Sequence, residues 1–177
     1  MPHKTALLIG APSTGKTSVL EALKQEGFIC YDEISRQITL EARAEGIEHL
    51  FKEKPLLFSE KLLEGRIQQF KASTTMPDEW TFLDRGLPDI TAYMDMVKQA
   101  FPHKFEMANR SYIYDKVFWF PVWQKIHQQD NERYEDFHLA NQIETYLLKW
   151  YSLYNYRLIE VPKTSVSNRV EFITSKL

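Results

Sequence analysis

Eight consecutive residues near the N-terminus constrain this chain more than any other part of its sequence. They are Gly10-Ala11-Pro12-Ser13-Thr14-Gly15-Lys16-Thr17, which match G-x-x-x-x-G-K-[ST] at every fixed position. A β-like run at 5–9 precedes them and a helical pattern at 16–25 follows. Glycines at these spacings let successive backbone N–H groups point at one phosphate, and the helix start adds its positive dipole end. The motif therefore predicts a phosphate-binding loop between a strand and a helix.

Two side chains of this loop have expected roles toward a nucleoside triphosphate such as ATP. We expect Lys16 to reach the β- and γ-phosphates and the Thr17 hydroxyl to ligate Mg²⁺. The alternative is a glycine-rich turn that only joins a strand to a helix. The other residues expected to contact the nucleotide are Gly10, Pro12, Ser13, Thr14, Gly15 and Ser18.

Short apolar runs alternate with helical patterns along the rest of the chain. Further strands are expected at 28–31, 80–83, 117–120 and 158–161, and helices at 34–44, 55–72, 88–100, 132–150 and 165–174. This alternation predicts an α/β fold, a parallel sheet with helices on both faces. We expect one domain over 1–177, in which helical insertions at about 34–72 and a lid at about 122–155 are the movable parts.

The composition argues against several classes of protein. A formal charge of −2, from 22 basic and 24 acidic residues, disfavours a general nucleic-acid binder. Cys30 is the only cysteine, so no intramolecular disulfide forms, which suits a reducing cytoplasm. The longest apolar runs, at 6–9 and 117–123, are far shorter than the ~20 residues of a membrane span. We therefore expect a cytoplasmic protein with no nucleic-acid or membrane partner.

Asp84 follows the expected strand at 80–83, where a phosphate-loop protein carries its second metal-holding side chain. We predict that Asp84 and Thr17 hold Mg²⁺ together; the alternative role of Asp84 is a helix cap or a turn residue. ATPases of the AAA type commonly have a glutamate at the next position to polarise water, but here the residue is Arg85. An arginine beside the transferring phosphates suits an anionic or hydroxyl-bearing acceptor, unless it makes only a structural ion pair.

Two acids, Asp32 and Glu33, follow the second expected strand, and the carboxyl ends of parallel strands line the ligand crevice. We expect one of them to bind an acceptor hydroxyl or take its proton; the alternative is that both cap the following helix. Arg36, one turn further on, is a candidate anion contact. Arg133, at the end of the polar segment 128–133, is expected either to fold over the phosphates or to lie on a solvated helix face.

At these residues the sequence resembles the P-loop kinase group, and more closely the NadR-like AAA domain family of ATPases and kinases, which includes ribosylnicotinamide kinase domains. The resemblance spans nearly the whole chain. It implies a three-layer α/β/α fold with a five-stranded parallel sheet in the order 2-3-1-4-5, a helical lid, and ATP and Mg²⁺ at the loop. It also implies that the loop at 162–166 lies beside the base. The matching segments are 10–17, Glu33-x-x-Arg36, Asp84-Arg85-Gly86, Asp130-x-x-Arg133, 154–162 and 165–170.

Together, these features predict a phosphotransferase that moves the γ-phosphoryl of ATP to a small hydroxyl acceptor, such as a nucleoside or nicotinamide riboside. The alternative is a nucleotide-dependent switch that binds a protein partner. An ATP-hydrolysing machine is disfavoured because no acid follows Asp84, and a conventional GTPase because the D-x-x-G spacing is absent at 84–87. The expected catalytic side chains are Lys16, Asp84, Arg85, Arg133 and either Asp32 or Glu33.

Overall fold

Five parallel strands form one sheet in the order β2-β3-β1-β4-β5 in the computed structural model, which describes residues 4–75, 80–127 and 137–177. The central strand pairs Leu7 with Leu83 on one side and with Val117 on the other. This result confirms the expected α/β fold and strand order. The strands are β1 (Lys4–Ile9), β2 (Ile29–Tyr31), β3 (Trp80–Asp84), β4 (Lys116–Trp119) and β5 (Leu158–Glu160).

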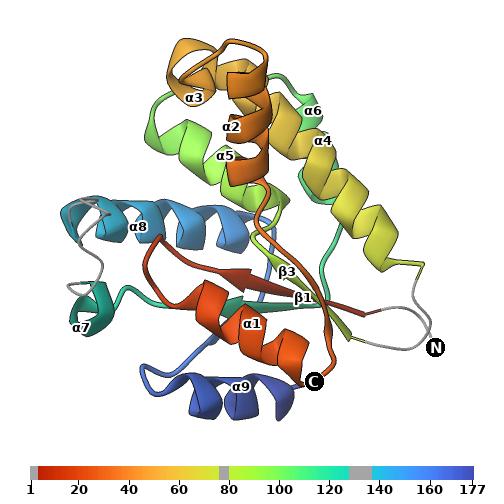
Figure 1. Ribbon diagram of the computed structural model, residues 1–177, viewed down its shortest axis with the longest axis vertical. Helices are drawn as coiled ribbons and strands as arrows, with labels where there is room; N and C mark the ends of the chain where they lie inside the picture. Colours follow the sequence, from red (N-terminus) through yellow and green to blue (C-terminus); the bar gives the residue numbers. More distant parts are fainter. Residues whose placement is uncertain (1–3, 76–79, 128–136) are drawn as a thin grey trace.

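Two pairs of helices cover the two faces of the sheet (Figure 1). Successive residues of β1 contribute to opposite faces of the sheet, because side chains along a strand point alternately to its two sides. Ala6 and Leu8 belong to the core beneath α1 and α9, and Leu7 and Ile9 to the core beneath α5 and α8. The helices of these layers are α1 (Lys16–Gln25), α9 (Val166–Thr174), α5 (Leu87–Met96) and α8 (Phe137–Leu153).

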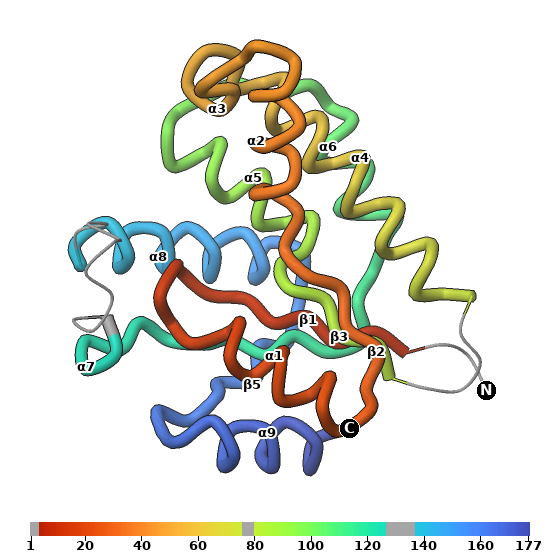
Figure 2. The backbone as a smooth tube through the Cα atoms, viewed as in Figure 1, coloured from red at the N-terminus to blue at the C-terminus, as the bar shows by residue number. Residues whose placement is uncertain are grey.

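A second group of helices packs beyond α5, at the top of Figure 2. It has its own apolar cluster, in which Leu62 and Leu63 of α4 (Pro55–Ser73) meet Ile90 and Met94 of α5. That helix begins at Pro55, because proline suits a first turn whose N–H groups have no helical partner. The group comprises α2 (Ser35–Ala44), α3 (Leu50–Glu53), α4 (Pro55–Ser73) and α6 (Lys104–Ser111), and α7 (Gln124–His127) follows β4 on its own.

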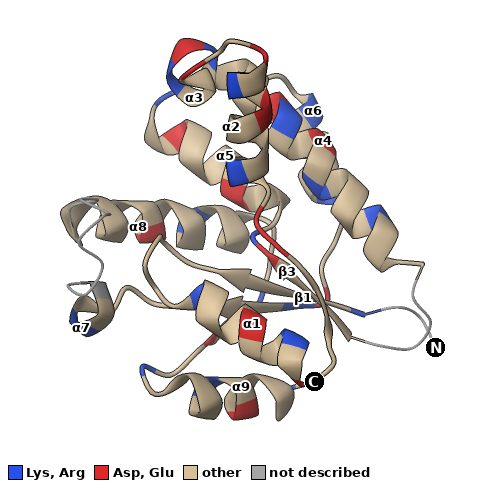
Figure 3. Ribbon diagram, viewed as in Figure 1, with Lys and Arg blue, Asp and Glu red and all other residues tan. Residues whose placement is uncertain are grey.

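Several helices carry charged side chains beside their buried residues. Both signs of charge occur on α1, α4, α8 and α9 (Figure 3). Across the three described stretches, no helix combines the length and the apolar character needed to cross a membrane.

Candidate active site

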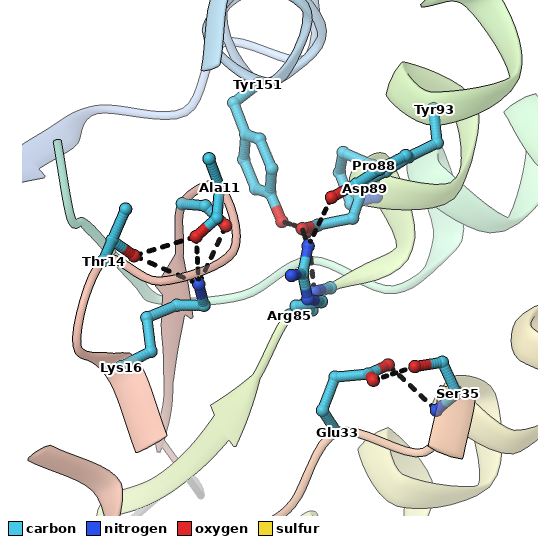
Figure 4. A network of polar contacts seen from close by, with 12 residues as sticks. Ala11, Thr14, Lys16, Glu33, Ser35, Arg85, Pro88, Asp89, Tyr93 and Tyr151 are labelled. Carbon is cyan, nitrogen blue, oxygen red and sulfur yellow. Dashed lines mark hydrogen bonds and ion pairs between the residues drawn. The ribbon is translucent and has the colours of Figure 1, made fainter. Parts of the chain in front are cut away.

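The loop between β1 and α1 closes around the side chain of Lys16 (Figure 4). The Lys16 ammonium donates to the carbonyls of Gly10 (2.9 Å) and Ala11 (2.8 Å) and to the Thr14 hydroxyl (3.2 Å). Gly15, directly before the helix, has φ +85, a conformation that L-residues with a side chain rarely adopt. Burial lowers the pKa of Lys16 to about 8. The loop therefore holds one desolvated cation at the N-terminus of α1.

Asp84 reaches the same edge of the sheet from β3. It lies opposite Leu8 in the β1–β3 register, one residue before β1 ends. Its side chain is buried, and Oδ1 has no hydrogen-bond partner among the described residues. Burial raises the pKa of the Asp84 carboxyl above its ordinary value, although Lys16 and Arg85 oppose the shift. The structure thus places a carboxylate oxygen without a donor beside the phosphate loop.

This oxygen fits the ligand preference of Mg²⁺. No group of three or more His, Cys, Asp or Glu side chains in the described part of the chain is arranged to hold a metal ion unaided. Magnesium in phosphoryl-transfer sites takes one or two protein oxygens and completes its shell with phosphates and water. Asp84, together with the exposed Thr17 in the first turn of α1, is therefore suited to a Mg²⁺ ion that arrives with a nucleotide.

A cavity of about 330 Å³ adjoins the phosphate loop, whose Pro12 forms part of its wall. The cavity runs along α5, from Asp89 in the first turn to Val97 directly after the helix. Its charged lining groups lie at the β3–α5 end, whereas the wall from α3, α4 and the later part of α5 is mostly apolar. The charged residues are Glu33, Arg66, Arg85 and Asp89, and the apolar ones include Phe51, Phe58, Leu62, Ile90 and Met94.

The structure separates the two acids after β2. Asp32 is exposed and accepts from the Lys24 ammonium at 2.7 and 2.9 Å, outside the cavity. Glu33 lines the cavity, where the Ser35 hydroxyl and backbone N–H both donate to it. Arg36 is exposed and absent from the cavity wall. Of these two acids, only Glu33 lines the cavity.

Arg66 of α4 connects Glu33 to the turn after β3. Its guanidinium donates to the carbonyl of Gly86 at 2.7 Å and to Glu33 at 3.2 Å, and the residue is 4% exposed. Burial alone would raise the pKa of Glu33, but Arg66 and Arg85 hold it below its ordinary value. Glu33 is therefore ionised at neutral pH, and Arg66 fixes its orientation.

Arg85 occupies a left-handed position, φ +70, between the two halves of the site. Its backbone N–H continues the sheet by donating to the carbonyl of Leu8 at 3.0 Å. Its guanidinium donates to the Tyr93 hydroxyl at 3.1 Å and lies 3.7 Å from Asp89. The expected ion pair of Arg85 exists, but the residue also lines the cavity. The two interpretations of Arg85 are therefore compatible.

Arg169 of α9 braces the phosphate loop from the other side. It donates to the carbonyls of Thr14 and Pro162, both at 3.1 Å, and its guanidinium centre lies 4.8 Å from the Trp123 ring centroid. A Cβ at Gly15 would lie 2.7 Å from its Nη1 atom. No carboxylate lies within ion-pair distance of Arg169 in the part of the chain described. Burial lowers its pKa below the ordinary arginine value.

Two arginines and one aspartate of this site were not predicted from the sequence, namely Arg66, Arg169 and Asp89. Two of them carry a recognisable signal. Arg66 lies within the apolar stripe of its helix, beside Leu62, Leu63 and Ile67, and Arg169 precedes the buried Val170. A cation on an apolar helix face needs a polar partner in the core. Arg133, predicted as a lid residue, lies outside the described residues.

The loop, the acid at the end of β3 and the strand order define a P-loop nucleotide-binding protein. A family model described as an AAA domain matches residues 5–169. The chain therefore belongs to this AAA domain family, as its resemblance implies. No curated protein matches the chain.

Solved structures share this fold at low sequence identity. Deoxyadenosine kinase from M. mycoides is 15% identical over 97% of each chain, with a TM-score of 0.72. The NadR protein in complex with NR is 14% identical over 98% of this chain and 50% of its own, with a TM-score of 0.75. Thymidylate kinase from Ehrlichia chaffeensis is 14% identical over the full length of both chains, with a TM-score of 0.65.

Proposed function

We propose that this protein transfers the γ-phosphoryl group of ATP to a hydroxyl of a small acceptor of nucleoside size. The observation that carries the proposal is the cavity beside the phosphate loop, with a carboxylate and a guanidinium at one end and an apolar wall at the other. Its volume of about 330 Å³ is within the usual range for small-ligand sites. The similar structures include two kinases named for deoxyadenosine and thymidylate, and NadR bound to NR. Their presence supports a nucleoside-like acceptor.

Each residue of the site has a separate role in the proposed transfer. Lys16 neutralises the phosphates, while Asp84 and Thr17 would hold Mg²⁺, which when bound would neutralise negative charge on the phosphate oxygens. Glu33 accepts the proton of the acceptor hydroxyl, because it is ionised and faces the cavity. Arg85 stabilises the phosphoryl group as it passes between donor and acceptor.

The acceptor's chemistry follows from the two ends of the cavity. A hydroxyl suits the Glu33 end, because the ionised carboxylate can accept its hydrogen. The apolar wall, with Phe51 and Phe58, suits a flat aromatic base that loses little by leaving water. A nucleoside satisfies both requirements in one molecule.

The experiment incubates the protein with ATP, Mg²⁺ and a panel of nucleosides, vitamin ribosides and nucleoside monophosphates, and identifies phosphorylated products by mass. Ser59→Leu is the matched control, since Ser59 lines the cavity and its enlargement blocks the acceptor without touching the phosphate loop. We expect one nucleoside-like acceptor to be phosphorylated by the wild type and not by Ser59→Leu. A protein that binds ATP tightly but phosphorylates nothing, and whose affinity for another protein differs between ATP and ADP, contradicts the proposal and supports the switch.

A further inference from the structure

A buried tyrosine and a buried aspartate hold the turn that carries Arg85. Asp89 lies in the first turn of α5 and Tyr151 on α8, and each is 0% exposed. The Tyr151 hydroxyl donates to Asp89 Oδ2 at 2.5 Å, and the backbone N–H of Gly86 donates to the same oxygen at 3.0 Å. Figure 4 shows the two side chains meeting beside Arg85. Neither has a part in the transfer described above.

The two carboxylate oxygens of Asp89 have different surroundings. Both hydrogen bonds end on Oδ2, whereas Oδ1 accepts none among the described residues and lies 3.7 Å from Arg85 Nη1. This distance allows an ion pair but is too long for a hydrogen bond. Asp89 therefore fixes the position of the Arg85 charge without accepting a hydrogen bond from the Arg85 guanidinium. The structure gives this guanidinium one hydrogen bond within the described residues, to Tyr93, so donors are left for a phosphoryl group.

The backbone of the turn depends on the same support. Arg85 has φ +70, a conformation that persists in a non-glycine residue only where its surroundings enforce it. A Cβ at Gly86 would lie 2.8 Å from the Tyr151 hydroxyl and 2.5 Å from Leu7 Cδ1, so Tyr151 packs directly over the turn. Removal of the Tyr151 hydroxyl therefore loosens both Asp89 and the turn.

Tyr151 donates this hydrogen bond across the whole neutral range. Burial raises its pKa well above the ordinary value, and the charge of Asp89 and the hydrogen bond to it act in the same direction. Tyr151 therefore remains protonated and keeps its hydroxyl hydrogen available as the donor to Asp89.

We infer that Tyr151 and Asp89 are positioning residues that hold the Arg85 guanidinium at the wall of the acceptor cavity. The inference rests on the proposed function, because it assigns Arg85 to the transferred phosphoryl group. Under this inference, α8 contributes to the site through Tyr151, although no residue of α8 lines the cavity. A misplaced Arg85 lowers kcat more than ATP affinity, because Lys16 and the phosphate loop hold the nucleotide.

The first test compares Tyr151→Phe with Tyr114→Phe. Both remove one hydroxyl from a buried tyrosine beside Gly86, but the Tyr114 hydroxyl makes no hydrogen bond to Asp89 in the described structure. Tyr151→Phe is expected to lower kcat roughly five- to tenfold, less than the ~10²–10³ of a lost direct donor, with the KM for ATP within about twofold. Tyr114→Phe is expected to keep wild-type kinetics.

A double-mutant cycle separates positioning from general destabilisation. In an Arg85→Met background, Tyr151→Phe is expected to cause no further loss of kcat, because the group that it positions is gone. Independent, multiplicative losses, or equal losses in both phenylalanine variants, overturn the inference. If Tyr151→Phe does not fold, Asp89→Asn replaces it, since it keeps the shape of Asp89 and removes the charge facing Arg85.

A second measurement is independent of turnover. The ¹H–¹⁵N NOE of the Arg85 Nε–H group, assigned with Arg85→Lys, reports how rigidly the guanidinium is held. We expect a high value in the wild type and in Tyr114→Phe, and a lower one in Tyr151→Phe. An unchanged value in Tyr151→Phe overturns the positioning role. A wild type that phosphorylates no acceptor, combined with a lowered value in Tyr151→Phe, removes the proposed function and leaves the positioning of Arg85 intact.

Discussion

The phosphate loop and the acceptor cavity share one edge of the sheet, but the chain builds them in different ways. The loop is continuous, from Gly10 to Lys16, and it meets phosphate with backbone N–H groups. The cavity takes its wall from α2, α3, α4 and α5, and its charged end is joined by side chains such as Arg66, which reaches from α4 to Gly86. The nucleotide side thus depends on local backbone geometry, and the acceptor side on packing between distant helices.

The two sides of the site are therefore expected to tolerate different side-chain substitutions. A backbone cradle is insensitive to most side-chain changes but fails when its single cation is lost. A cavity between packed helices can change its lining one residue at a time and so take a different acceptor. Both expectations are open to test by substitution.

Loss of the loop cation should have the largest effect. Lys16→Ala is expected to reduce kcat/KM for ATP by about 10³ and to weaken ATP binding, because no other side chain supplies charge within the loop. Lys24→Ala, at a partly exposed lysine near the end of the same helix, is the control and should stay near wild type. Calorimetry and steady-state kinetics measure both, and an unchanged Lys16→Ala protein would remove the phosphate-loop assignment.

The metal-holding role of Asp84 comes next. Asp84→Asn keeps the shape of the side chain and removes its charge, so turnover should fall about 10² while the melting temperature changes little. An asparagine caps a helix almost as well as an aspartate, so a simple cap predicts normal activity instead. Titration of turnover with Mg²⁺, beside thermal unfolding, distinguishes the two.

On the acceptor side, Glu33→Gln should reduce acceptor phosphorylation by roughly 10², the lower end of the range for a lost general base, and leave ATP affinity unchanged. Asp32→Asn is its matched neighbour and should lose less than about twofold, since Asp32 pairs with Lys24 in solvent. Single-turnover transfer measures the rate for each variant. If the two variants lose activity equally, the cavity does not mark the acceptor side.

The two sides should also differ in pH dependence. Burial lowers the pKa of Lys16 to about 8, and the neutral amine attracts phosphate less than the ammonium, so affinity for ATP should fall as pH rises through 8. At pH 9 about a tenth of these side chains stay protonated, so affinity should drop by up to about tenfold from pH 7. Glu33, whose pKa is held below its ordinary value, titrates only in acid. Calorimetry from pH 7 to 9 in two buffers should show the loss and a proton uptake; a flat affinity contradicts it.

The smallest effect belongs to the brace behind the loop. Arg169→Met removes the donors to Thr14 and Pro162, so the KM for ATP should rise about fivefold with kcat within about twofold. Arg169→Lys should recover only part, because an ammonium cannot make the forked contact. Arg157→Met, at an exposed arginine before β5, is the control. A change in kcat alone would move Arg169 from support of the loop to the transfer step.

The sequence predicted much of the sheet and of the nucleotide side. The strand order implied by the resemblance is confirmed, and the helix expected at 16–25 has those bounds. The helix expected at 88–100 ends at Met96, and α6 was missed, because only Phe105, Ala108 and Asn109 of its eight residues are buried. So short an apolar face gives a weak periodic signal.

The acceptor side was less accessible to prediction. Adjacent residues such as Asp32 and Glu33 have the same chemistry, and only the direction of the chain after β2 sends one into solvent and the other into the cavity. Asp89 looks like an ordinary acid in the first turn of a helix, and its partner Tyr151 lies 62 residues away. Such pairs arise from packing, which no local pattern contains.

The contact between Arg169 and the Thr14 carbonyl has a consequence during synthesis on the ribosome. A nascent chain exposes the phosphate loop early, but the helix that braces it is made more than 140 residues later, since the two partners are 155 residues apart. At about 5–20 residues per second, this interval lasts roughly ten to thirty seconds. Until α9 emerges, the loop lacks its brace and α1 lacks its neighbour in the core. The growing chain is thus expected to complete its nucleotide site only when α9 docks.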